Sequence, residues 1–194
     1  MLPSLPKGFK MKKILSFALA MMLMLTLALS MVSCGEETEV PDGMKYACNP
    51  DIVDYSLFVP ESWIVDITTG SSMAHVSESD FSSVQVAQWN LTNEIKDFDT
   101  WWKDYKASVE RLGAVEYVTE LENTVVDQIA SKKCEYKLTM NKDTANERTY
   151  SYMVICTITK GSAYVFLYTS LEDGNLYKTN MPVIEEILKE FKFN

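Results

Sequence analysis

The sequence is poor in the residues on which most catalytic and metal sites depend. Its 194 residues include one histidine, His75, four cysteines and seven glycines. A Ser-His-Asp triad needs a histidine beside a nucleophile and an acid, and the serines near His75 lack the glycines of a nucleophile elbow. Seven glycines leave little room for a phosphate-binding loop, and no cysteine or histidine spacing indicates a metal site. We therefore expect no catalytic residue, no cofactor and no metal ligand.

Basic residues are also few, 18 against 27 acidic ones. Four of the lysines lie within residues 1–33, which contain no acidic residue; the remainder has 14 basic and 27 acidic residues, a net charge of −13. A segment this acidic repels nucleic acid and anionic lipid headgroups. We therefore expect no nucleic-acid partner, and the length suits a single domain.

The first 33 residues are typical of a bacterial secretory signal peptide. Lys12 and Lys13 precede an apolar run over residues 14–32, and small residues then lead to Cys34. The segment Met31-Val32-Ser33-Cys34 resembles a lipobox, in which the cysteine thiol receives a diacylglyceryl group and becomes the mature N-terminus. We therefore expect a lipoprotein held on a cell membrane, facing outside the cytoplasm, by the acyl chains on Cys34. A retained transmembrane helix and an ordinary cleaved signal are the alternatives.

The rest of the chain is expected to form an acidic linker over residues 34–52 and one α+β domain over residues 53–194. Apolar stripes predict a helix from Asp97 to Leu112, capped by Asp97 or Asp99, and a last helix capped by Asn180. Antiparallel hairpins with two amphipathic helices predict a single, mostly antiparallel sheet covered by helices. Alternating apolar residues place the strands at 54–59, 63–65, 73–76, 82–91, 115–121, 124–129, 134–140, 150–158 and 163–170.

Three cysteines, Cys48, Cys134 and Cys156, remain once Cys34 is lipidated. In the hairpin that joins residues 134–140 to 150–158, a register in which paired residue numbers sum to 290 places Cys134 opposite Cys156. Such a pair can form a disulfide at a non-hydrogen-bonded position, where the Cα atoms come closest. The alternative is a pair of reduced thiols that pack as small apolar groups.

Three segments carry a resemblance to a known family. They are Tyr55–Pro60 followed by Trp63, the aromatic strand Ala163–Ser170, and the closing helix Met181–Phe193 with its terminal Phe-x-Phe. Together they resemble the PsbP-like α/β/α-sandwich family, which includes the extrinsic PsbP protein of photosystem II, a nuclear import factor that binds a small GTPase, and many bacterial lipoproteins. The resemblance implies a helix–sheet–helix sandwich and a binding or assembly role rather than catalysis.

These observations favour a lipid-anchored, non-catalytic binding or accessory module for a protein or peptide partner. Trp101 and Tyr177 are candidates for its binding surface, although the helical stripe favours a core position for Trp101. A sensor of a small ligand or of a metal ion at the acidic loop around Ser79 is the alternative. A hydrolase that uses His75 is the third hypothesis.

Overall fold

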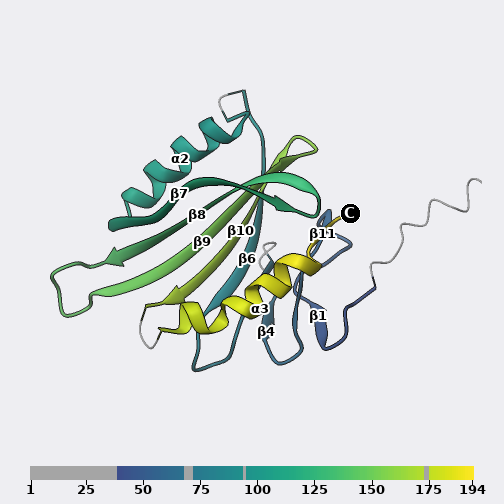
Figure 1. Ribbon diagram of the computed structural model, residues 1–194, viewed down its shortest axis with the longest axis horizontal. Helices are drawn as coiled ribbons and strands as arrows, with labels where there is room; N and C mark the ends of the chain where they lie inside the picture. Colours follow the sequence, from purple (N-terminus) through teal and green to yellow (C-terminus); the bar gives the residue numbers. More distant parts are fainter. Residues whose placement is uncertain (1–38, 68–71, 94, 173–174) are drawn as a thin grey trace, which may run out of the picture. The chain divides into compact units, whose positions relative to one another are not determined.

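The computed structural model describes residues 39–67, 72–93, 95–172 and 175–194 (Figure 1). The chain divides into two compact units, residues 1–39 and 40–194, and every described strand and helix lies in the second. The predicted signal peptide and the predicted lipid-bearing Cys34 lie outside the described residues. Within the described ranges, no helix is both long and apolar enough to span a bilayer.

A seven-stranded sheet, antiparallel throughout, forms the centre of the second unit, in the order β4-β5-β6-β10-β9-β8-β7. Two tight hairpins set the order of its long strands. Asp127 and Gln128, and then Lys160 and Gly161, have positive φ angles, as two-residue hairpin turns require. The strands are β4 (Ile64–Asp66), β5 (Ser72–His75), β6 (Ser83–Asn90), β7 (Ala114–Val126), β8 (Ile129–Met140), β9 (Arg148–Thr159) and β10 (Ser162–Leu171).

The expectation of a single sheet was wrong, because the described residues also form two two-stranded sheets. Strand β1 (Met44–Tyr46) pairs with β3 (Phe58–Pro60), and β2 (Tyr55–Ser56) pairs with β11 (Lys192–Phe193). The strand expected over residues 54–59 is thus divided between two sheets at Leu57.

The reason for this division lies in the segment expected to be a linker. Two residues of that segment are hydrogen-bonded to Leu57. Ala47 N donates to the Leu57 carbonyl at 2.8 Å, and Leu57 N donates to Cys48 Sγ at 3.3 Å. Both Ala47 and Cys48 are buried. The folded domain therefore begins before residue 53.

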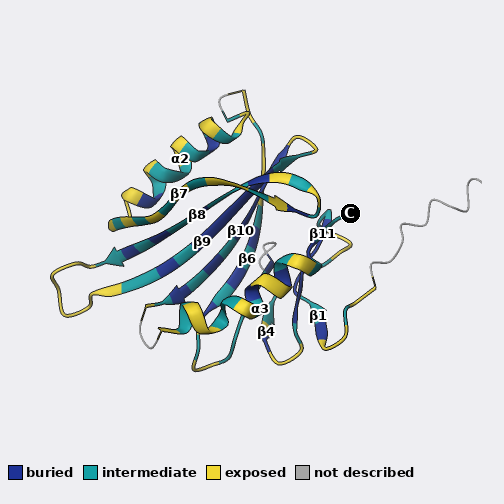
Figure 2. Cartoon of the chain, viewed as in Figure 1, coloured by how far each residue is buried: buried dark blue, intermediate teal, exposed yellow. Residues whose placement is uncertain are grey.

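Two helices, α2 (Phe98–Glu110) and α3 (Leu176–Glu190), pack on opposite faces of the large sheet. Alternate residues of a strand point to opposite faces, and along β10 Ala163 and Val165 pack with α2 whereas Tyr164 and Phe166 pack with α3. Figure 2 shows the resulting bands of buried residues along β8, β9 and β10. The layers are therefore helix, sheet and helix. The buried residues on the α2 side, which we call the α2-side core, are Trp101, Val109, Cys134, Tyr136, Leu138, Val154, Cys156, Ala163 and Val165.

The start of α2 was predicted correctly, whereas the start of α3 was not. Asp97 caps α2: its carboxylate accepts from Thr100 N at 2.9 Å, and Thr100 Oγ1 accepts from Asp97 N at 3.2 Å. Helix α3 begins a turn earlier than expected, after Asn175, whose φ is 60°. The side chain of Asn180 lies within the helix and donates to Asp80 Oδ2 at 3.0 Å, so it ties α3 to the loop after β5 instead of capping the helix.

The predicted hairpin register was wrong by two residues, and the three described cysteines are free thiols. Cys134 pairs with Val154, and Cys156 pairs with Lys132. Residues 141–147, which connect β8 to β9, form two turn hydrogen bonds, and Met140 pairs with Arg148. Cys134 and Cys156 are therefore diagonal neighbours, about 7–8 Å apart, which exceeds the Cα separation that a disulfide spans.

The native thiols are expected to be unreactive. Burial raises the pKa of Cys134 to about 11 and that of Cys156 to about 12, and it also raises the pKa of Cys48. Because the thiolate is the reactive form, we expect Ellman's reagent at neutral pH to detect no thiol in the native unit 40–194 and three in guanidinium chloride. Only one thiol in the unfolded protein would show that a disulfide forms.

Candidate functional site

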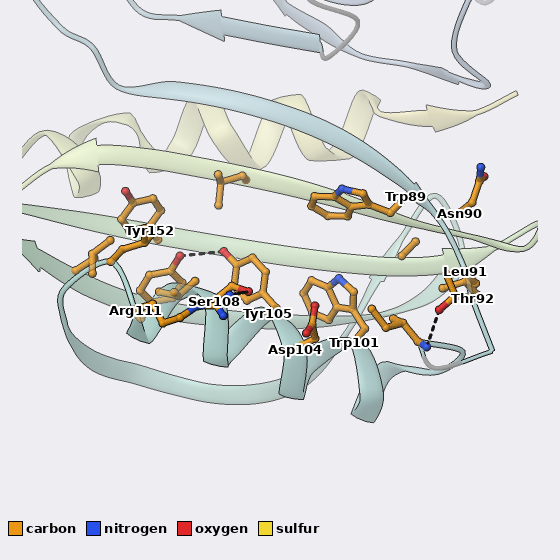
Figure 3. A pocket seen from close by; sticks show the side chains of 17 residues that line it. Trp89, Asn90, Leu91, Thr92, Trp101, Asp104, Tyr105, Ser108, Arg111 and Tyr152 are labelled. Carbon is orange, nitrogen blue, oxygen red and sulfur yellow. Dashed lines mark hydrogen bonds between the residues drawn. The ribbon is translucent and has the colours of Figure 1, made fainter.

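A pocket of about 850 Å³ lies between α2 and the sheet (Figure 3). Its roof is formed by Trp101, Tyr105 and Val109, which follow one another at intervals of four residues and so share one face of α2. Its floor comes from neighbouring strands of the sheet and includes Leu138 of β8 and Ala163 of β10. The volume is within the range of about 300–1,000 Å³ that small-molecule sites occupy.

Several side-chain contacts join α2 to the edge strand β7. Tyr117 of the edge strand β7 lies 6.0 Å from the Trp102 ring, measured between ring centroids, and Lys106 Nζ lies 4.6 Å above its ring. The Tyr117 hydroxyl also donates to Glu110 Oε1 at 3.3 Å. These contacts attach α2 to the β7 edge of the sheet, and the pocket is lined by residues of β6, β8, β9 and β10.

Two tyrosines meet across the pocket. The hydroxyls of Tyr105 and Tyr136 are 2.9 Å apart, Tyr105 stacks on Trp101 at 5.0 Å, and Tyr136 stacks on Tyr152 at 4.8 Å. Burial raises the pKa of Tyr105 to about 12. Burial, and then the neighbouring Tyr105, raises the pKa of Tyr136 above its usual range. Both hydroxyls are therefore protonated at neutral pH and bonded to each other, so this part of the pocket is aromatic and uncharged.

One edge of the pocket is charged. Asp104 and Ser108 lie on α2 and Arg111 is its C-cap residue (Figure 3), and Arg111 Nη2 donates to Ser108 Oγ at 3.1 Å. Among the residues that the structure describes, neither Asp104 nor Arg111 has an ion-pair partner within 4.0 Å. The pocket therefore combines an apolar interior with two opposite, unpaired charges at its edge.

The structure does not bring the two predicted surface residues together. Trp101 lies in the pocket, with 5% of its surface exposed. Tyr177 belongs to α3 on the opposite face of the sheet, where it stacks on Tyr168 at 5.0 Å and donates to Glu135 Oε2 at 3.0 Å. It lines a smaller pocket of about 170 Å³, where Lys137 and Glu172 form an ion pair at 2.6 Å.

Sequence reasoning missed the other residues of the larger pocket. Trp89 and Leu112 line it and are 49% and 59% exposed, whereas the sequence places Trp89 only within the strand expected over residues 82–91 and Leu112 only at the end of the expected helix. Nothing in the sequence shows how far α2 extends across the sheet, and this position decides which side chains border the empty space.

The residues of the hydrolase hypothesis and of the sensor hypothesis contact other parts of the protein. His75 on β5 stacks against the exposed ring of Phe81, with 6.3 Å between the ring centroids. In the acidic loop, the Asp80 carboxylate accepts from Ser82 N at 2.8 Å and also from Asn180. Across the described part of the chain, no three histidine, cysteine or acidic side chains are grouped so as to hold a metal ion.

Comparison with known proteins identifies the fold. No protein-family model matches the chain, and no curated protein matches its sequence. Its structure is similar to cyanobacterial PsbP from Synechocystis sp. PCC 6803, with a TM-score of 0.51, 14% identity, and coverage of 84% of this chain and 98% of that one. It is also similar to the Ran-binding protein Mog1p of Saccharomyces cerevisiae, with a TM-score of 0.51, 13% identity, and coverage of 72% and 90%. The chain therefore has a PsbP-like fold, as the sequence resemblance implied.

Proposed function

We propose that the protein is a lipid-anchored, extracytoplasmic, non-catalytic binding module, and that it binds its ligand in the pocket between α2 and the sheet. The pocket carries this proposal. It opens to solvent, has a volume of about 850 Å³ and includes a buried tryptophan among mostly apolar walls, as is typical of ligand-binding sites. The anchor on Cys34 and the location outside the cytoplasm rest on the sequence.

The lining favours an apolar ligand or the apolar part of one. Aliphatic side chains such as Leu138 and Leu167 lie beside the aromatic rings, and the two buried tyrosine hydroxyls are bonded to each other. Each square ångström of apolar surface removed from water contributes roughly 25 cal/mol. A ligand that displaces water from these walls would bind through this contribution.

Filling the pocket is expected to abolish binding without unfolding the protein. Leu167 is half-buried in the pocket wall, so in the Leu167→Trp variant the indole takes up the empty space. We expect the unit 40–194 to bind the neutral dye N-phenyl-1-naphthylamine saturably, and the variant to bind it about tenfold more weakly or not at all. Dye fluorescence measures the affinity, and thermal melting checks the fold.

Val125→Trp is the matched control, because Val125 is 65% exposed on β7 and lies outside the pocket. It should bind the dye as the wild type does. The proposal fails if the wild type shows no saturable binding, or if Leu167→Trp binds as tightly as Val125→Trp.

A protein or peptide partner is the second candidate function. It is favoured by the exposed Trp89 and Leu112 at the pocket, since exposed tryptophans often anchor interfaces, and by the fold shared with a protein described as Ran-binding. The pocket would then receive an apolar side chain of the partner. A protein from solubilised membranes that is retained by the wild type and by Val125→Trp, but not by Leu167→Trp, would support this function.

A further inference from the structure

The pocket follows the length of α2. Its lining on α2 extends from Trp101 to Val109, which is about 12 Å along the helix axis, and Arg111 and Leu112 continue it beyond the end of α2. Strand residues lie opposite along this length (Figure 3). An elongated space with apolar walls suits an extended hydrocarbon chain better than a compact polar molecule.

The charges at the edge lie about one helical turn apart. Ser108 is four residues from Asp104, so their side chains are neighbours on α2, with about 5–6 Å between Cβ atoms. Arg111 extends back along the helix to Ser108, to which its Nη2 donates at 3.1 Å. The guanidinium is thereby placed one turn from the Asp104 carboxylate, and both groups lack an ion-pair partner among the described residues.

A head group of one charge would meet repulsion at this edge. An anion at Arg111 would face Asp104, the negative C-terminal end of the α2 dipole and a chain with 27 acidic against 18 basic residues. A cation at Asp104 would face Arg111. A head group that carries both charges satisfies both side chains, and Arg favours phosphate or carboxylate because its planar fork donates two parallel hydrogen bonds.

We infer that the ligand is a single-chain zwitterionic amphiphile, with its tail along α2 and its ammonium and phosphate or carboxylate groups at Asp104 and Arg111. The inference rests on the proposed function of the pocket and specifies its ligand class. Trp101 and Leu138 would contact the tail, and Ser108 would lie between the two charges of the head group.

Calorimetric titration of the unit 40–194 tests this inference; the unit contains both hydrophobic cores entirely. The ligands are dodecylphosphocholine and dodecyl betaine, each below its micelle concentration, compared with dodecyl maltoside, dodecyl phosphate and dodecyltrimethylammonium. We expect one of the two zwitterions to bind about tenfold more tightly than dodecyl maltoside, dodecyl phosphate and dodecyltrimethylammonium. Asp104→Asn and Arg111→Gln should each weaken its binding about fivefold and leave dodecyl maltoside binding unchanged.

Asp99→Asn and Lys103→Gln are charge-matched controls, because both residues are exposed on α2 and neither lines the pocket. They should leave every affinity unchanged. Equal binding of all five amphiphiles, or variants at 104 and 111 that behave like the controls, would overturn the inference about the head group and leave the proposed function in place. If no amphiphile binds, both fail. If glycerophosphocholine, which has no tail, binds as well as dodecylphosphocholine, the tail has no role.

Discussion

Replacing Gly113 with alanine is expected to destabilise the domain by about 3 kcal/mol or to prevent it from folding. Gly113 joins α2 to β7, and a Cβ atom there would lie 2.3 Å from the Thr139 carbonyl oxygen and 3.2 Å from Leu138 Cδ1. The carbonyl cannot move aside freely, because Thr139 pairs with β7 on one side and with β9 on the other. Urea unfolding of the unit 40–194 measures the loss.

Gly161→Ala separates this steric effect from the general effect of replacing a glycine. Gly161 has a φ of +77°, and nothing lies within 4 Å of a Cβ built there, so the substitution strains the backbone without a clash. Its cost should be about 1 kcal/mol. Equal losses in the two variants would show that the close approach to Thr139 is not what makes Gly113 necessary.

The elements that the sequence predicted best are those determined by nearby residues. The start of α2 depends on Asp97 and Thr100, three residues apart, and its buried face on apolar residues spaced by one turn. The strands expected over 82–91, 150–158 and 163–170 match β6, β9 and β10 to within two residues. Such signals lie within one element and need no knowledge of its partner. The strands expected over 115–121 and 124–129 were wrong, because β7 runs unbroken over Ala114–Val126 and the hairpin turn at Asp127 and Gln128 falls inside the second range.

The features that were missed depend on segments far apart in the chain. The division at Leu57 exists because Met44–Tyr46 and Lys192–Phe193 pair on either side of it. The observed register of β8 and β9 differs by two residues from the predicted one. A shift of two residues keeps every side chain on the same face of the sheet, so both registers fit the apolar pattern equally well. No local pattern distinguishes between registers that bury the same faces.

The candidate site was only partly predictable for the same reason. The stripe on α2 identified Trp101 as inward-facing, and the structure places it both in the α2-side core and in the pocket. Periodicity shows which face of a helix is apolar, but it does not show what lies opposite that face. The pocket beside Trp101 is lined by residues of β6, β8, β9 and β10, and α2 is attached to β7 through Tyr117, so its walls depend on contacts between separate elements.

Helix α3 is expected to contribute far more to stability than to binding. Ile187, predicted to lie on its apolar stripe, is fully buried against the sheet, and Ile187→Ala should cost about 3–4 kcal/mol because it leaves a cavity. Ile52→Ala is the matched control, since Ile52 is 73% exposed; its cost should stay within about 0.5 kcal/mol. Urea unfolding measures both, and similar losses would contradict the burial of Ile187.

The same variant tests whether the pocket is independent of the opposite face. A ligand that binds only the folded state raises the free energy of unfolding by an amount fixed by its concentration and affinity. Because Ile187 lies across the sheet from the pocket, N-phenyl-1-naphthylamine should raise the free energy of unfolding equally in the wild type and in Ile187→Ala. A smaller increase in the variant would mean that the packing of α3 changes the shape of the pocket on the opposite face of the sheet.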